Sequence, residues 1–334
     1  MRHEVGVKAL GLLSGGLDST LAVKLMLEQG VEVEAVNFLT PFCLCGTKKC
    51  DATDVASRFQ VKLKRIFLGD EYLSMLRKPK HGYGKNMNPC IDCRILMLKK
   101  AKQYAKRIGA GFIFTGEVLD ERPMSQHRRA MEIIEREGGL EGKILRPLSA
   151  KCLPETDAEK KGWVEREKLL DIKGRSRKRQ IELARSFGLS DYPCPAGGCL
   201  LTDREFAAKI GDLFKHKRAV RLKDIFLLKV GRHFRLGSNK IIVGRNKMEN
   251  KSLLSLKAPG DYFFEVPDCG SPITILQGRK SSEAIRIAAS LTARYSDAKG
   301  ENVQVAYGTD RSRKSVSVSP LLSEHVDRLR IAWK

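Results

Sequence analysis

The chain has 334 residues, of which 42% are hydrophobic and 30% charged, a composition typical of globular proteins. No apolar run approaches the roughly 18 residues that a membrane helix needs, and no signal-peptide pattern opens the chain, so we expect a cytoplasmic protein that does not contact membranes. The net charge of +23 favours a polyanionic partner, nucleic acid above all. Nine cysteines in such a chain indicate metal ligands or reactive thiols rather than a disulfide framework.

A glycine-rich segment at residues 14–20 (SGGLDST) lies between a predicted strand at 7–13 and a predicted helix that continues through 21–27. Glycines allow backbone N–H groups to surround an anion, and the helix N-terminus adds a partial positive charge. The segment also offers three hydroxyls and the carboxylate of Asp18, which could hold a magnesium ion or a nucleotide hydroxyl. It lacks the lysine of a Walker A loop. We therefore predict a phosphate-binding turn of another kind; the alternative is a turn that only packs a helix on a sheet.

Strand and helix patterns alternate through the first 150 residues. Further strands are predicted at 31–38, 62–67 and 111–116, and helices near 51–59 and 93–108. On the second helix the predicted core face carries Leu96, Met97, Ala101, Tyr104 and Ala105. This alternation predicts an α/β domain with a doubly wound parallel sheet over 1–150, which binds its ligand at the carboxyl ends of the strands. Residues 120–122 are interpreted as the start of a polar loop.

The pattern changes after residue 150. Residues 151–220 form a basic connector, with its densest charge at 174–180. Residues 221–334 are predicted to form a smaller α+β domain, with a helix at 281–295 and short strands at 225–230, 233–236, 240–243, 302–307 and 315–318.

The cysteines are clustered along the chain. Cys90 and Cys93 form a CxxC that opens a predicted helix, whose N-terminus should favour their thiolate forms. Cys194 and Cys199 lie on a later loop, and a closed zinc site made by these four residues is one interpretation. Cys43, Cys45 and Cys50 follow the second strand, either as a second metal site or as partly buried thiols.

The glycine-rich segment resembles the SGGxDS signature of the PP-loop ATP pyrophosphatases, which adenylate a substrate and release pyrophosphate. The resemblance implies ATP and Mg²⁺ as cofactors and Asp18 as a catalytic residue. It implies that ATP contacts residues of the loop and of two strand ends: Ser14, Gly15, Gly16, Asp18, Ser19, Thr20, Phe38, Gly116 and Glu117. For Phe38, a strand-end core aromatic is the alternative.

A CxxC beside such a loop, together with a distant cysteine pair, is similar to the tRNA thiolation enzymes. An Asn-Pro-x-x-x-Cys pattern of the 2-thiouridylases matches residues 88–93, and their Gly-x-Cys-apolar-apolar pattern matches 197–201, while Thr115-Gly116-Glu117 resembles 4-thiouridine synthases. The resemblance implies that Cys93 and Cys199 are catalytic, in an ATP-dependent sulfurtransferase that adenylates a uridine carbonyl of tRNA and replaces its oxygen with sulfur. The sulfur donor would be sulfide or a persulfide carrier.

Two routes for the sulfur remain open. In one, Cys90, Cys93 and Cys199, with Cys194 as an alternative ligand, hold a [4Fe–4S] cluster whose open iron carries sulfide. In the other, Cys199 carries a persulfide and Cys93 resolves it as a disulfide.

Residues 222–318 resemble the NFACT RNA-binding module. The resemblance is carried by Gly244-Arg245-Asn246, an aromatic strand at 262–264 and a glycine-proline turn at 270–272. It implies that this domain docks tRNA. Candidate phosphate contacts are Arg232, Arg235, Arg245 and Lys247, and Phe234 or Tyr262 could stack on a base.

Two other functions fit parts of the sequence. A PP-loop enzyme could use a nitrogen nucleophile to amidate its substrate, although no glutaminase-like cysteine or domain is visible. A non-catalytic RNA-binding protein with a structural metal site is the second; it would release no pyrophosphate in the presence of RNA.

Overall fold

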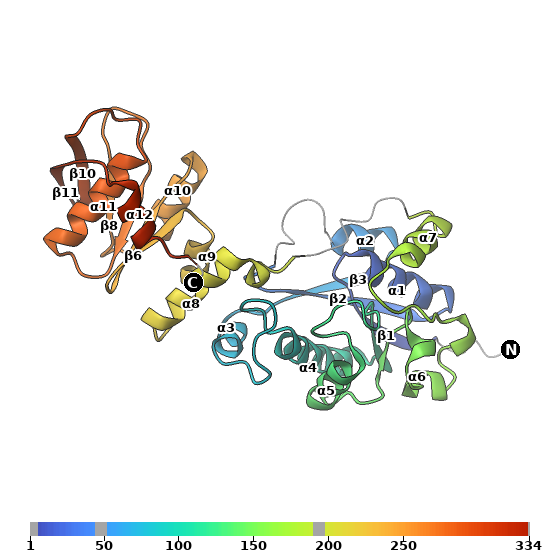
Figure 1. The fold of residues 1–334 in the computed structure, drawn as a ribbon. Coiled ribbons are helices and arrows are strands. Elements are labelled where there is room, and N and C mark those ends of the chain that lie inside the picture. The colour runs from blue at the N-terminus through green and yellow to red at the C-terminus, as the bar shows by residue number, and fades with distance from the viewer. Residues whose placement is uncertain (1–5, 44–51, 190–197, 333–334) are drawn as a thin grey trace. The chain divides into compact units, whose positions relative to one another are not determined.

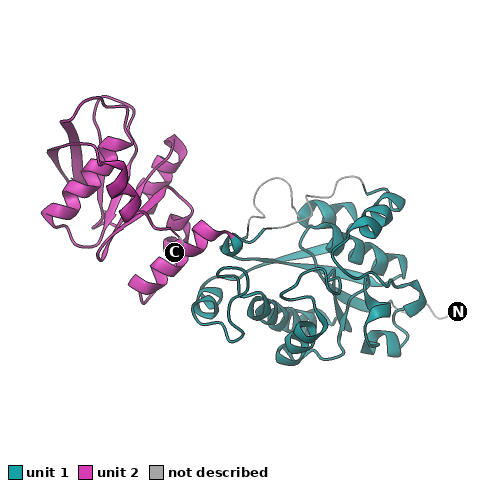
Figure 2. Ribbon diagram, viewed as in Figure 1, with its two compact units in different colours: residues 1–202 teal, residues 203–334 magenta. Residues whose placement is uncertain are grey.

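The computed structural model describes residues 6–43, 52–189 and 198–332, and it divides the chain into two compact units. Unit 1 comprises residues 1–202 and unit 2 residues 203–334 (Figure 2). Much of the segment that we expected to be a connector, up to residue 202, thus lies within unit 1. No helix in the described ranges is long and apolar enough to cross a membrane.

Unit 1 contains a five-stranded sheet in the order β3-β2-β1-β4-β5 (Figure 1). Its strands are β1 (Lys8–Leu12), β2 (Glu32–Leu39), β3 (Lys62–Phe67), β4 (Phe112–Thr115) and β5 (Ile144–Leu145), and every neighbouring pair is parallel. The predicted doubly wound parallel sheet is confirmed. Because the order of the strands reverses between β1 and β4, a crevice opens at their carboxyl ends, where such sheets bind ligands.

Helices cover both faces of this sheet. One apolar core involves α1 (Leu17–Glu28), α2 (Ala52–Arg58) and α7 (Lys178–Ser186); the opposite core involves α4 (Cys90–Ile108) and α5 (Arg128–Gly138) (Figure 1). The remaining helical segments of the unit are α3 (Asp70–Arg77), α6 (Asp157–Lys160) and the 3-10 turns η1 (Ala150–Cys152), η2 (Arg166–Lys168) and η3 (Leu200–Thr202).

The buried face of α4 differs from the predicted one. Ile95, Leu98, Ala101 and Ala105 are its buried apolar residues, whereas Leu96 and Met97 are only half-buried. The helix begins at Cys90, three residues earlier than expected, and Met97 faces a cavity. The 3.6-residue period fits two overlapping apolar stripes here, and packing against the sheet selects one of them.

Unit 2 is built on a six-stranded antiparallel sheet in the order β11-β10-β8-β9-β7-β6. The strands are β6 (Arg232–Leu236), β7 (Asn239–Val243), β8 (Tyr262–Glu265), β9 (Thr274–Gln277), β10 (Val303–Thr309) and β11 (Ser312–Val318). Its helices are α8 (Arg204–His216), α9 (Leu222–Leu228), α10 (Lys247–Leu256), α11 (Ser282–Arg294) and α12 (Ser323–Leu329). Alanines of α11 pack into the core of the sheet. The predicted α+β character is confirmed.

The prediction of a strand at 225–230 is wrong, because residues 222–228 form helix α9. The carboxylate of Asp224 accepts a hydrogen bond of 2.9 Å from the backbone N–H of Arg221, the residue that caps the helix. This side-chain contact at the third helical position stabilises a helix start and outweighs the β propensity of the apolar run that follows.

Lys240 on β7 is buried, with an exposed fraction of 7%, and burial lowers its pKa to about 8. The unfolded chain holds this proton up to about pH 10.5, so between pH 8 and 10.5 it binds more protons than the folded chain. The free energy of unfolding should therefore rise across this window, by about 3 kcal/mol. Urea unfolding of the wild type and of Lys240→Met at pH 7 and pH 10 tests this prediction. The free energy of unfolding of the variant should lack the increase that the wild type owes to Lys240. The exposed Lys251→Met is the control; an equal rise in all three proteins would contradict the prediction.

Candidate active site

The glycine-rich loop connects β1 to α1 at the crevice. Gly15 has a φ of +81°, a conformation that side chains other than glycine rarely adopt. The Ser14 backbone N–H donates to Ser19 Oγ at 3.2 Å, and Ser19 Oγ donates to the Gly16 carbonyl at 2.9 Å. Gly16 is the N-cap residue of α1 and makes no side-chain capping hydrogen bond. The loop is thus held by its own serines and presents the helix N-terminus, an arrangement suited to phosphate.

Gly116 lies against this loop, immediately after β4. A Cβ at this position would sit 2.5 Å from the carbonyl carbon of Asp18 and from the Cα of Ser19. The chain after β4 and the first turn of α1 therefore touch backbone to backbone. This close contact leaves no room for a Cβ atom, which explains why position 116 needs glycine independently of any contact with ATP.

Gly116→Ala should push the first turn of α1 away from β4, because neither backbone can move without disturbing the sheet. We expect the free energy of unfolding to fall by about 2 kcal/mol and ATP binding to weaken by about 10-fold or more. Chemical denaturation and calorimetric titration with ATP measure the two effects. Gly162→Ala is the control, because a Cβ at position 162 would meet no atom within 4 Å. The φ of +68° at Gly162 adds some backbone strain to this variant. Unchanged ATP affinity in Gly116→Ala would show that the close approach is not required.

Asp18 shares an arginine with a second carboxylate. Arg177 donates to Asp18 Oδ2 at 3.1 Å and also pairs with Glu121. Burial, reinforced by the nearby charge of Glu121, raises the pKa of Asp18 to about 6 even though Arg177 opposes the shift. Asp18 Oδ1 and Glu121 Oε2 are buried and have no hydrogen-bond partner among the described residues. Two carboxylate oxygens left in this state suit a divalent cation, so the donor chemistry fits Mg²⁺.

Glu117 is buried at the end of β4 and is held by two arginines. Its Oε1 lies 3.3 Å from Arg94 Nε, and its Oε2 lies 3.1 Å from Arg146 Nε. Burial by itself would raise the pKa of Glu117, but the two guanidinium groups bring it below its ordinary value. The carboxylate is therefore ionised and occupied by this ion-pair cluster, which supports a role in shaping the site.

A single cavity of about 460 Å³ joins the loop to the cysteines. Among the predicted site residues, it is lined by Ser14, Gly16, Asp18, Ser19, Phe38, Cys90, Cys93, Gly116, Glu117 and Cys199. Two predicted residues of the loop, Gly15 and Thr20, do not line the cavity but shape the loop. Gly15 supplies the turn of the backbone, and the Thr20 hydroxyl donates to the Gly16 carbonyl at 2.9 Å. Cys194, Cys45 and Cys50 lie outside the described residues.

Three thiols of this cavity have raised pKa values rather than the lowered ones expected at a helix N-terminus. Burial raises the pKa of Cys90, that of Cys93 to about 11 and that of Cys199 to about 12. The expectation that the start of α4 favours thiolates is thus wrong for the structure without ligands, because desolvation outweighs the partial charge of the helix end. A hydrogen bond to Tyr72 acts in the opposite direction on Cys93 without reversing the shift.

The same thiols fit an iron–sulfur cluster by their chemistry. Thiolate sulfur is the usual ligand of such clusters, and Cys90, Cys93 and Cys199 line one cavity. In the described ranges, no three His, Cys, Asp or Glu side chains are already grouped as a metal site. Binding a cluster would therefore require these thiols to converge and lose their protons.

Sequence reasoning missed several residues of the site. It assigned 174–180 to a basic connector and Glu121 to a polar loop, whereas Arg177 and Glu121 contact each other beside Asp18. It left Cys43 undecided, and this residue lines the cavity with the other cysteines. No local pattern identifies Arg177, because its partner lies 159 positions earlier in the chain. The only available signal for Cys43 was its position at the carboxyl end of a predicted strand.

Sheet topology and the position of the glycine loop at the reversal of strand order make unit 1 an α/β domain, and its lysine-free loop resembles that of the PP-loop proteins. Residues 5–151 match the family model described as thiamine biosynthesis protein (ThiI), and residues 231–330 match that of the NFACT protein RNA binding domain. The predicted resemblance to PP-loop thiolation enzymes, followed by an NFACT-type region, is confirmed.

The curated relatives match less than half of the chain. It is 29% identical over 124 residues to a tRNA-specific 2-thiouridylase of Marinobacter nauticus, covering 34% of this chain and 32% of the relative. It is 31% identical over 150 residues to a probable tRNA sulfurtransferase of Thermococcus kodakarensis, covering 42% and 36%. The chain thus spans about a third of the length of these relatives.

Two solved structures are similar at a low level. One is a 4-thiouridine synthetase–RNA complex with bound ATP, with 22% identity, a TM-score of 0.34 and coverage of 63% of this chain and 51% of that one. The other is the U34-tRNA thiolase NcsA of Methanococcus maripaludis with its [4Fe–4S] cluster, with 19% identity, a TM-score of 0.35 and coverage of 63% and 67%.

Proposed function

We propose that the protein is an ATP-dependent tRNA sulfurtransferase that converts a uridine of tRNA to a thiouridine in the cytoplasm. The observation that carries this proposal is the single cavity that is lined both by the glycine-rich loop and by four cysteines. The relatives named above act on tRNA according to their names, which agrees with this chemistry.

In the first half-reaction, backbone N–H groups at the start of α1 bind the β and γ phosphates of ATP. Asp18 and Glu121 would hold Mg²⁺ through their unpartnered oxygens, and the metal would neutralise the developing charge on pyrophosphate. Arg177 lies where it can exchange its carboxylate partners for a phosphate oxygen. The uridine carbonyl oxygen attacks the α phosphorus, pyrophosphate leaves, and the base becomes an adenylated electrophile.

In the second half-reaction, sulfur attacks the activated carbon and AMP leaves with the former carbonyl oxygen. On the thiol route, a persulfide on Cys199 delivers its outer sulfur, and Cys93 attacks the inner sulfur, so that thiouridine is released and a Cys93–Cys199 disulfide forms. On the cluster route, Cys90, Cys93 and Cys199 would hold a [4Fe–4S] cluster, which would supply sulfide as the nucleophile.

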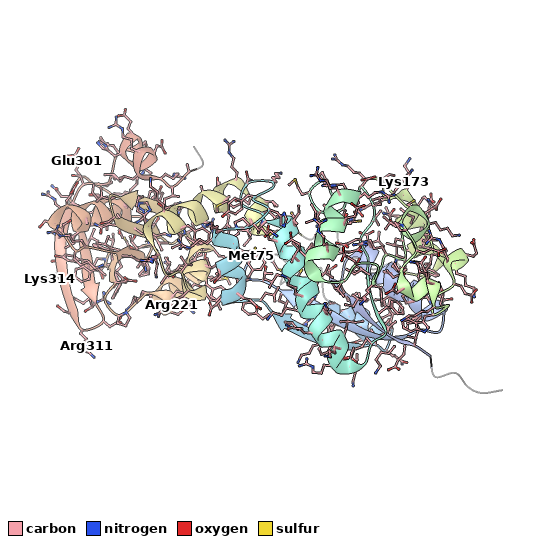
Figure 3. The ribbon with its side chains drawn as sticks, turned by 90° about the horizontal axis from the view of Figure 1, so that it is seen from below. Met75, Lys173, Arg221, Glu301, Arg311 and Lys314 are labelled. Atoms are coloured by element: carbon pink, nitrogen blue, oxygen red, sulfur yellow. The ribbon has the colours of Figure 1, made fainter. Side chains whose placement is uncertain are left out.

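Unit 2 is proposed to dock the tRNA. Its β10–β11 hairpin carries exposed basic residues, among them Arg311 and Lys314 (Figure 3), and Arg313 lies 4.4 Å from the ring centroid of Phe263. Of the two predicted stacking residues, Phe234 is fully buried and cannot contact a base, whereas Tyr262 is half-buried. Among the predicted phosphate contacts, Arg235 is paired with Asp212 and Arg245 with Glu249, so RNA would compete with these carboxylates.

The experiment that tests the proposal is anaerobic purification followed by incubation with tRNA, ATP, Mg²⁺ and a sulfur donor. We expect pyrophosphate release that depends on tRNA, together with thiouridine in the digested tRNA. Pyrophosphate release without thiouridine would favour an amidating enzyme, and RNA binding without pyrophosphate release would favour a non-catalytic protein. Iron, sulfide and zinc analysis of the same preparation separates the cluster route from the thiol route and from a structural zinc site.

A further inference from the structure

Cys43 lies directly opposite Cys199 in the wall of the cavity. The two residues form an isolated antiparallel bridge, one from the chain after β2 and the other from the residue before η3. The Leu200 N–H donates to the Phe42 carbonyl at 3.0 Å, and this bond joins the residues that flank the pair.

This pattern fixes how close the two side chains are. When the flanking residues carry the hydrogen bond, the opposing pair is the narrow, non-hydrogen-bonded kind, with Cα atoms about 4.5 Å apart and side chains on the same face. Disulfide-bonded cysteines have Cα atoms separated by about 4.4 to 6.8 Å. A sulfur atom can therefore pass between Cys43 and Cys199 without a rearrangement of the backbone.

The surroundings of the Cys43 sulfur differ from those of Cys199. The Thr40 backbone N–H donates to Cys43 Sγ at 3.3 Å, and Thr40 Oγ1 also lies 3.3 Å from this sulfur. Since the same hydroxyl accepts a hydrogen bond from the Phe42 N–H at 3.2 Å, its own proton is available to Cys43. These two contacts hold the Cys43 side chain in place beside Cys199.

We propose that Cys43 is the entry point for sulfur, taking a sulfane sulfur from a persulfide donor and passing it to Cys199. The proposal rests on the proposed tRNA thiolation and specifies its thiol route. Nothing in the sequence patterns or in the matches to relatives assigns this role to Cys43.

The transfer balances without an oxidant or a reductant. The Cys43 sulfur first attacks the outer sulfur of the donor persulfide, and the donor leaves as a thiol. The Cys199 thiol gives its proton to water, and its sulfur then attacks the outer sulfur of the Cys43 persulfide. One sulfur–sulfur bond forms on Cys199 as the bond to Cys43 breaks, and Cys43 Sγ takes the electron pair and afterwards a proton.

Labelling with glutathione persulfide that carries a heavy sulfur isotope tests the proposal on the full chain. In Cys199→Ser the label should stop on Cys43, where peptide mass spectrometry finds it. In Cys43→Ser the rate at which Cys199 acquires label should fall by about 10-fold or more. Cys269→Ser, which removes an exposed thiol of unit 2, should label Cys199 at the wild-type rate.

The outcomes separate this proposal from the proposed function. If Cys199→Ser carries no label on Cys43, or if Cys43→Ser loads Cys199 at the wild-type rate, the entry role is overturned, whatever the thiolation assay shows. A Cys199 that takes up no sulfur in the wild type because it is bound to iron also overturns it. Sulfur that moves from Cys43 to Cys199 in a protein that never releases pyrophosphate would uphold the relay and refute tRNA thiolation instead. Should Cys43→Ser fail to fold, the Cys199→Ser labelling still decides.

Discussion

Asp18→Asn should reduce tRNA-dependent pyrophosphate release by about 10³-fold, because the amide can neither hold a divalent cation as a carboxylate does nor balance Arg177. Asparagine has nearly the same shape, so the loop itself should persist. The affinity for tRNA should stay unchanged, since the NFACT-type region lies in unit 2. Steady-state pyrophosphate assays and a tRNA-binding titration measure the two quantities.

Stability provides the control for Asp18→Asn. Burial raises the pKa of Asp18 to about 6, so at pH 7 the folded chain carries an ionised group in a site that disfavours its charge. Without ATP, the variant should therefore unfold at the same or a higher temperature than the wild type at pH 7. Loss of activity together with a lower melting temperature would indicate a damaged fold, and retained activity would remove the glycine-rich loop from the mechanism.

Cys93→Ser should abolish thiouridine formation over many turnovers, whereas tRNA-dependent pyrophosphate release should still occur in the first turnover. On the thiol route Cys93 resolves the intermediate, so its loss should leave the tRNA attached to Cys199 through a disulfide. Gel electrophoresis without reductant should show a protein–RNA adduct that dithiothreitol releases. Cys269→Ser should behave as the wild type in this assay.

The same variant distinguishes the cluster route. If Cys90, Cys93 and Cys199 hold a cluster, Cys93→Ser should lose iron and sulfide in parallel, and no covalent adduct should form. Full thiolation by Cys93→Ser would contradict both routes. Cys93 is only half-buried, and serine is only slightly smaller than cysteine, so the fold should survive the substitution. Thermal unfolding of the variant checks this.

Much of the architecture followed from local sequence patterns. The alternation of apolar runs with helical periodicity was sufficient to predict the parallel sheet of unit 1, because a strand buried on both faces leaves a continuous apolar run. The phosphate-binding turn was predictable for a related reason: Gly15 at positive φ and the Ser14–Ser19 hydrogen bonds involve residues within six positions of one another. The CxxC was also visible in the sequence, because its two cysteines lie only three positions apart at the start of one helix.

Other features depended on contacts between distant parts of the chain. Arg177 reaches Asp18 only because α7 packs beside α1, and Cys43 meets Cys199 across 155 intervening residues. The raised pKa values of Cys93 and Cys199 likewise arise from burial by several elements, which overrides the local effect of the α4 N-terminus. The sequence by itself therefore determined the class of domain and the chemical groups available, since these depend on local periodicity and residue type. Only the tertiary structure decided which groups face one another and how strongly each is desolvated, because both are set by long-range packing.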